Sequence, residues 1–205
     1  MGRLLRGHPH GRGRGVHDLR APAGVTDVLP TLTHAAALIV TAIAAVLDHR
    51  SGKIPNWLTL PLIGVGPALW GVANGFNGML MSVVGIGFCG LAPLIAYRMG
   101  GMAGGDVKLF AGIGGLVGPI AGIEAEFYAM VVASIASIVV LAWHGKLLGT
   151  FSNMFFVVFR KALPERWRRD AKPELRHKLR IGPFIFAGTA VAMVLRHPEW
   201  IGMAP

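Results

Sequence analysis

Long stretches without charged residues alternate with short charged segments along the chain. The uncharged runs cover residues 28–47, 54–97, 109–123, 127–145 and 181–195. A helix needs about 20 residues to cross the hydrocarbon of a bilayer, so the longest run must contain two membrane spans. The Asn- and Gly-rich segment 74–78 is the natural break between them. The pattern therefore predicts an all-α polytopic membrane protein with about six transmembrane helices.

Composition agrees with a membrane protein rather than a soluble domain. Hydrophobic residues make up 53% of the 205 residues and charged residues only 15%, while the mean hydropathy is +0.56. An ordinary soluble globular domain is excluded by these values. The runs 109–123 and 181–195 are short, and they reach spanning length only if flanking Lys and Arg side chains extend towards the headgroups.

Most Lys and Arg residues fall in segments that follow the first, third and fifth predicted spans. They include Arg50, Lys53, Arg98, Lys108 and the basic loop 144–180. The opposite loop between the fourth and fifth spans carries Glu124 and Glu126 instead. Because cytoplasmic loops carry the excess of Lys and Arg, this distribution predicts that the basic segments face the cytoplasm.

Two basic segments lie outside the predicted spans. Residues 1–30 are rich in Gly, Arg and His, which predicts a disordered basic tail. The orientation given above puts this tail outside the cytoplasm, so it is either an artefact of an upstream start site or a tail that is translocated despite its charge. Residues 31–205 form the transmembrane domain. In the loop 144–180, apolar residues at helical spacing predict an interfacial amphipathic helix that anchors the loop or guides a substrate. The chain has a net charge of +10, and its expected partner is anionic lipid, not nucleic acid.

Two aspartates, Asp48 and Asp106, stand at the ends of apolar runs. A carboxylate beside hydrocarbon is costly and is kept mainly where chemistry or transport requires it. Two aspartates that share a site repel each other and hold one proton between them, so one can activate water while the other protonates a carbonyl oxygen. The two residues are therefore predicted to form an aspartyl-protease site, with the role of each left open.

The residues around Asp106 favour this chemistry. Gly104 and Gly105 precede it and leave the backbone free to adopt strained dihedral angles and to approach a substrate strand closely. Asp106 would then lie at a helix N-terminus, where free N–H groups stabilise its ionised form. Lys108 could hold or bias a carboxylate, or simply extend towards the cytoplasm.

The segment after Asp48 contains three further candidates. Pro55 is expected to end the loop before the second helix, and Asn56 is expected to cap that helix. Lys53 has the same two interpretations as Lys108: a partner of the carboxylates, or an ordinary cytoplasmic lysine.

These two segments resemble the motifs of the type IV prepilin peptidases, a family of intramembrane aspartyl proteases. The similarity lies in Asp48 followed by Ile54-Pro55-Asn56, and in Gly105-Asp106-Val107-Lys108-Leu109. The second family motif usually reads GxGD, but Ala103 stands at its first position here. The segment 180–184 also resembles the start of the last span in family members. The resemblance implies that Asp48 and Asp106 are the catalytic pair.

What the resemblance implies about function is specific. The enzyme would remove the basic leader from prepilin substrates with an apolar helix, at the cytoplasmic face of a bacterial inner membrane and without a cofactor. Long members also carry a zinc-binding tetracysteine segment and methylate the new N-terminus. This chain has the single Cys89 and eight His residues without ligand spacing, so no metal site is expected. It thus resembles the short, protease-only form associated with Flp-type pili, and the archaeal preflagellin peptidases.

Other interpretations remain open. Residues 85–90 match GxGxxG, but they lie in an apolar span, where close helix packing explains glycines better than dinucleotide binding does. Gly114 and Gly118 have GxxxG spacing and could pack the fourth span against the first. A small proton- or cation-coupled transporter using Asp48 and Asp106, which predicts acids nearer mid-span, is the main alternative function. A membrane scaffold is another, and the oligomeric state is undetermined.

Overall fold

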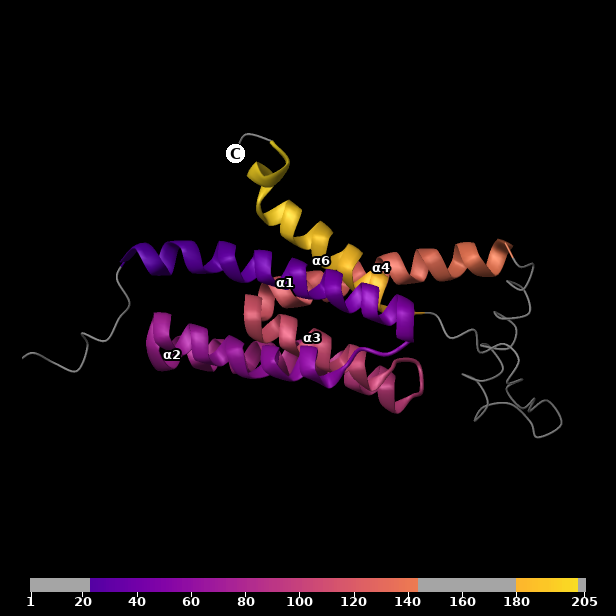
Figure 1. The fold of residues 1–205 in the computed structure, drawn as a ribbon, viewed down its shortest axis with the longest axis horizontal. Coiled ribbons are helices and arrows are strands. Elements are labelled where there is room, and N and C mark those ends of the chain that lie inside the picture. Colours follow the sequence, from indigo (N-terminus) through magenta and orange to yellow (C-terminus); the bar gives the residue numbers. More distant parts are fainter. Residues whose placement is uncertain (1–22, 144–179, 203–205) are drawn as a thin grey trace, which may run out of the picture.

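The computed structural model describes residues 23–143 and 180–202, and within these ranges the regular structure is entirely helical (Figure 1). The elements are α1 (Ala23–Ser51), α2 (Asn56–Arg98), α3 (Gly104–Val117), α4 (Pro119–Trp143), α6 (Gly182–Arg196) and the short 3-10 helix η3 (Pro198–Ile201). The predicted all-α class is confirmed. The predicted interfacial helix and nearly all of the basic loop 144–180 lie outside the described residues.

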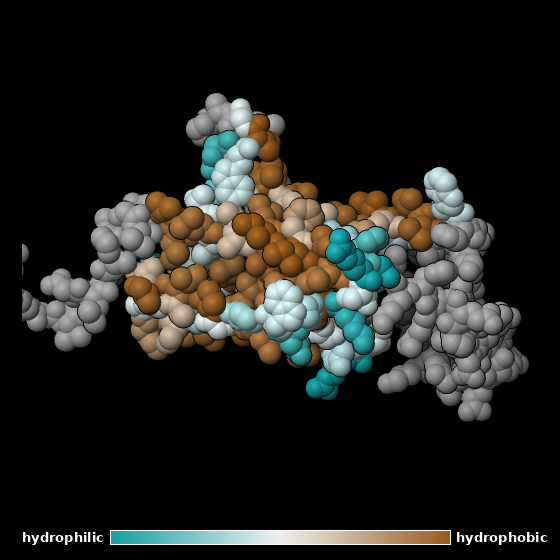
Figure 2. Space-filling view, viewed as in Figure 1, coloured by the Kyte–Doolittle hydropathy of each residue, from teal (hydrophilic) through white to brown (hydrophobic). Residues whose placement is uncertain are grey.

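Three helices of the described chain are long and apolar enough to cross a membrane. The qualifying segments are Val28–Ser51, Asn56–Arg98 and Pro119–Val140. The helices α3 and α6 are shorter, with 14 and 15 residues. Large apolar side chains are exposed along the bundle, and Figure 2 shows them covering most of its length. Such a surface is stable against lipid and not against water, so the chain is a membrane protein.

The first helix starts before the boundary predicted at residue 30. It begins at Ala23 and continues through Pro30. Leu29, just before the proline, is buried in the bundle, and Thr33 donates a hydrogen bond from Oγ1 to the Pro30 carbonyl at 2.9 Å. The helix therefore includes residues 23–30, which composition assigned to the tail.

The predicted break at 74–78 is confirmed, although both limbs belong to one long element, α2. Gly75 has φ 65° and ψ −155°, a backbone conformation that only glycine adopts readily. After it the chain folds back so tightly that a Cβ at Gly78 would collide with the Trp70 carbonyl. The limbs 56–74 and 76–98 are thus the two arms of a helical hairpin.

The helix α3 packs against both arms of this hairpin. A Cβ at Gly85 would collide with the carbonyl oxygen of Gly114, and one at Gly66 would lie 2.5 Å from the carbonyl oxygen of Gly115. The indole N–H of Trp70 also donates to the Leu116 carbonyl at 2.8 Å. The interpretation of the GxGxxG glycines as packing residues is confirmed at Gly85. The α3 glycines face α2, however, and not the first span as predicted.

The boundary between α3 and α4 differs from the prediction. The charged pair Glu124 and Glu126 was expected to mark a loop, but both residues lie inside α4. The helix instead breaks at Gly118, whose φ is 86°, and restarts at Pro119. A glycine with positive φ followed by a residue without an N–H interrupts a helix whatever the charge of its neighbours.

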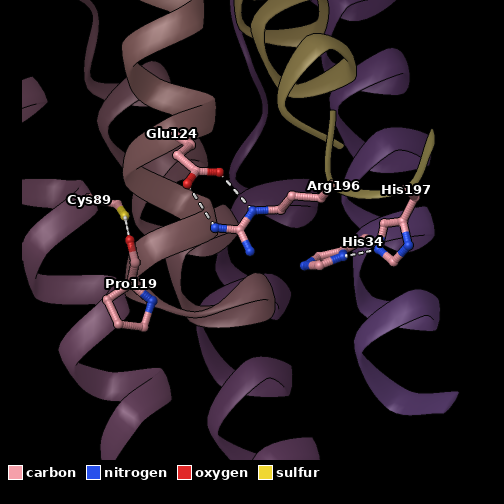
Figure 3. Close-up of polar contacts among 6 residues, drawn as sticks. All are labelled: His34, Cys89, Pro119, Glu124, Arg196 and His197. Carbon is pink, nitrogen blue, oxygen red and sulfur yellow. Dashed lines mark hydrogen bonds and ion pairs between the residues drawn. The ribbon is translucent and has the colours of Figure 1, made fainter. Parts of the chain in front are cut away.

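The helix α6 contacts α1 and α4. A Cβ at Gly188 of α6 would collide with the backbone of Ala129 in α4, so these helices touch directly. Figure 3 shows the polar contacts at the far end of α6. Arg196 donates to both carboxylate oxygens of Glu124 at 2.7 and 2.9 Å, and the rings of His197 and His34 form a hydrogen bond of 2.7 Å. These contacts tie the C-terminal end of α6 to both neighbours.

Candidate active site

Asp48 lies in the last turn of α1, where its side chain is buried with 6% exposure. Its Oδ2 accepts a hydrogen bond of 2.9 Å from the backbone N–H of Gly182. Gly182 is the first residue of α6, and the contact is itself buried. The first N–H groups of a helix have no partner within the helix, so the start of α6 offers a donor suited to a carboxylate.

Asp106 is the third residue of α3 and is 4% exposed. Its Oδ2 accepts a hydrogen bond of 3.2 Å from the N–H of Ala103, the N-cap residue of the helix. The predicted position of Asp106 at a helix N-terminus is confirmed. Ala103 has φ −90° and ψ 153°, an extended conformation open to any residue. Alanine in place of the family's first glycine therefore does not disturb the turn.

The two aspartates meet at one end of the helix bundle. The helices α1 and α3 contact each other, and the two carboxylates are close enough for their charges to interact. In Figure 1 the end of α1 and the start of α3 lie at the same end of the molecule, on the right. Residues separated by 58 positions are thus brought within electrostatic reach in a buried environment, where like charges resist simultaneous ionisation.

The segments that carry the aspartates also dock on each other. A Cβ at Gly105 would lie 3.0 Å from Cβ of Ile54 and 3.1 Å from its carbonyl oxygen, so only glycine fits there without displacing the loop. Gly104 lies beside the ring of Tyr97, and a Cβ at Gly104 would lie 3.7 Å from the nearest atom of that ring. The Lys108 ammonium donates to the side-chain oxygen of Asn56 at 2.8 Å. The two motifs therefore form one structural unit.

Two predicted roles are corrected by this arrangement. The N-cap of α2 is Pro55, with no side-chain capping hydrogen bond, so Asn56 does not cap the helix. Its side chain turns to Lys108 instead, and Lys108 consequently binds an amide and not a carboxylate. Lys53 is exposed, and within the described residues it has no ion pair with Asp48 or Asp106.

The sequence does not single out Gly182 as a site residue, although the segment 180–184 resembles the start of the last span in family members. A backbone N–H carries no sequence signal of its own. The Gly-Pro pair at residues 182 and 183 is the only hint, because proline is favoured in the first turn of a helix. The structure therefore adds a third segment to the two that carry the aspartates.

Comparison with known proteins identifies the family. The model of the type IV leader peptidase family matches residues 35–145, which is more than half of the chain and includes Asp48 and Asp106. No curated protein and no solved structure shows significant similarity. The matched region contains both aspartate segments and the helical hairpin between them. On this match, and with its apolar helices, the chain belongs to the type IV leader peptidase family of membrane peptidases.

Proposed function

We propose that this protein is an aspartic endopeptidase that removes the leader peptide from prepilin-like substrates, with Asp48 and Asp106 as its catalytic pair. The observation that carries the proposal is that two buried aspartates from separate, contacting helices lie at one end of the bundle, close enough for their charges to interact. Burial of two acids at the same place is costly in an apolar protein, and hydrolysis by a carboxylate pair accounts for it.

The chemistry needs one proton shared by the pair. The ionised aspartate takes a proton from a water molecule, and the oxygen of that water forms a bond to the carbonyl carbon of the scissile peptide. The protonated aspartate gives its proton to the carbonyl oxygen, which yields a tetrahedral diol. Collapse of the diol breaks the C–N bond. The protonated aspartate gives its proton to the departing nitrogen, and a hydroxyl of the diol returns its proton to the other aspartate as the new carboxyl group forms, so that the pair again holds one proton.

The position of the acids favours a peptidase over the alternative transporter. A carrier would be expected to hold its ion-binding acids nearer mid-span. Asp48 lies in the last turn of α1 and Asp106 in the first turn of α3. A site at the helix ends is accessible to a substrate segment that projects from the membrane surface, as a leader peptide does.

The distribution of charge supports a cytoplasmic site. The exposed basic residues of the described chain at the aspartate end are Arg50, Lys53, Arg98 and Arg180. Figure 2 shows hydrophilic residues gathered at that end of the bundle. With the positive-inside rule, and with the two arms of α2 counted as two of about six spans, the aspartates face the cytoplasm of a bacterial inner membrane.

The family and the composition support a proposed substrate class and subtype. A prepilin presents a basic leader next to an apolar helix, and its polar or acidic residues would contact the basic end of the bundle. The chain has one cysteine, Cys89, which is fully buried. One thiol cannot form a tetracysteine zinc site, so we assign the protein to the short form without N-methyltransferase activity, as associated with Flp-type pili.

The function is tested by purifying the protein in lipid nanodiscs and adding a prepilin with a basic leader. We expect a shorter product on a gel, and N-terminal sequencing of that product identifies the scissile bond. Proteoliposomes loaded with a pH indicator test the transporter in parallel. Proton flux without cleavage of any leader-bearing prepilin would contradict the proposal.

The hydrogen bond between Lys108 and Asn56 links the two aspartate segments, so its removal should slow the reaction. For Lys108→Met we expect kcat to fall by up to about fivefold, since an exposed hydrogen bond contributes about 1 kcal/mol. The measurement is the initial rate of prepilin cleavage. Arg98→Met removes a charge from the same end without touching Asn56 and serves as the control. Equal rates for the two variants would show that the link has no role.

A further inference from the structure

A third segment of the chain, the start of α6, contacts the catalytic pair. We propose that Gly182 is a positioning residue for Asp48, so that the peptidase site is completed by a segment beyond residues 35–145, the range that the family model matches. The inference rests on the proposed function, because it assumes that Asp48 is catalytic.

The contact is short and leaves no room for a side chain. The Gly182 N–H donates to Asp48 Oδ2 at 2.9 Å. A Cβ at residue 182 would lie 2.7 Å from the Asp48 Cβ and 2.9 Å from the same Oδ2. Real Cβ atoms do not approach other carbon atoms this closely, so any residue other than glycine must move the carboxylate or the helix. The absence of a side chain is what allows the backbone donor to reach Asp48.

The donor is held on a rigid element. Pro183 follows Gly182 in the first turn of α6 and restricts the backbone there. Further along, Gly188 lies directly against the backbone of Ala129 in α4, so the two helices are in close contact. A donor fixed in this way can hold a catalytic group in its productive geometry.

The consequence is a defined orientation for the Asp48 carboxylate. With Oδ2 engaged by Gly182, the other oxygen, Oδ1, is the one presented to the water or the substrate. Gly182 therefore fixes the orientation of the Asp48 carboxylate.

The test is the kinetics of Gly182→Ala with a prepilin substrate in nanodiscs. The added methyl group displaces the carboxylate, and we expect kcat to fall by about tenfold to one hundredfold with KM little changed. The pH–rate profile of cleavage should also move, because the hydrogen bond between Gly182 and the catalytic pair is lost. A residue that only supports the fold would lower the amount of active enzyme and leave that profile in place.

A second variant removes the donor without adding volume. Replacing Gly182 by glycolic acid, through nonsense suppression with the α-hydroxy acid, exchanges the N–H for an ester oxygen. This change cannot collide with Asp48, so the protein should fold even if Gly182→Ala does not. We expect the same loss of kcat and the same movement of the pH–rate profile.

Two glycine variants serve as matched controls. Gly87 lies in α2 with no atom near the position of a Cβ, so Gly87→Ala should have wild-type kinetics. Gly188→Ala collides with the α4 backbone and should lower the thermal midpoint without moving the pH–rate profile of the folded fraction.

The outcomes separate this inference from the proposed function. If substituting either aspartate by Asn abolishes cleavage while the glycolic acid variant keeps the wild-type kcat and pH–rate profile, the positioning role is wrong and the peptidase assignment stands. If the Asn variants still cleave, the peptidase assignment itself fails, whatever Gly182 does.

Discussion

Asp48→Asn and Asp106→Asn should each abolish cleavage of a prepilin substrate while the protein stays folded. An amide of the same shape can neither take a proton from water nor give one to the carbonyl oxygen. Because general acid–base catalysis contributes at least about one hundredfold to a rate, each variant should lose at least that factor in kcat. Both side chains are buried, so folding must be checked by circular dichroism and gel filtration of each variant. The readout is the gel shift of a co-expressed prepilin.

Glu124→Gln is the control for this pair of variants. Glu124 is also a carboxylate of an apolar helix, but it binds Arg196 at the far end of α6. Its side chain is 42% exposed and that of Arg196 is 32% exposed, and ion pairs of this kind contribute little. Cleavage should therefore remain at the wild-type rate. Activity that survives in either aspartate variant would overturn the assignment of the catalytic pair.

Gly85→Ala should strongly destabilise the protein. A Cβ at this position would collide with the carbonyl oxygen of Gly114, and both partners belong to helix backbones that cannot move independently. Overpacking typically costs about 1–3 kcal/mol, and a collision with backbone belongs at the upper end of that range or above it. The expected result is a lower thermal unfolding midpoint and a loss of cleavage, because α3 carries Asp106.

Gly87→Ala provides the comparison for Gly85→Ala. The two glycines lie two positions apart in α2, but the Cβ position at Gly87 is open. Alanine in a helix interior is about 0.5–1 kcal/mol more favourable than glycine, so this variant should be as stable as the wild type or slightly more stable. If the two variants unfolded at the same temperature, the close contact between α2 and α3 would not be what holds α3 in place.

These predictions concern one structural unit. The helix α3 begins at the catalytic end with Asp106, and its glycine-rich face packs on the hairpin of α2. The same hairpin begins at Asn56, which binds Lys108 of α3. The packing that buries α3 therefore also sets where Asp106 lies relative to the loop that follows Asp48.

Much of the local structure was predictable. The reversal at Gly75 follows from a Gly- and Asn-rich segment inside an apolar run too long for one span. The placement of Asp106 at a helix N-terminus follows from the glycines before it. Each of these features depends on residues close together in the chain, and a single sequence contains that information. The break at Gly118 is equally local, because it depends on the Gly118-Pro119 pair and not on the charges of Glu124 and Glu126.

The sequence alone determined the helical class, the membrane environment and the two aspartate segments, because apolar runs and short motifs are properties of neighbouring residues. Only the tertiary structure decided that Asn56 binds Lys108, that the glycines of α3 face α2 and that Gly182 donates to Asp48. Those contacts join residues far apart in the chain. They depend on how whole helices pack. A backbone N–H donor is present in every residue type except proline, so the sequence does not reveal which one binds Asp48.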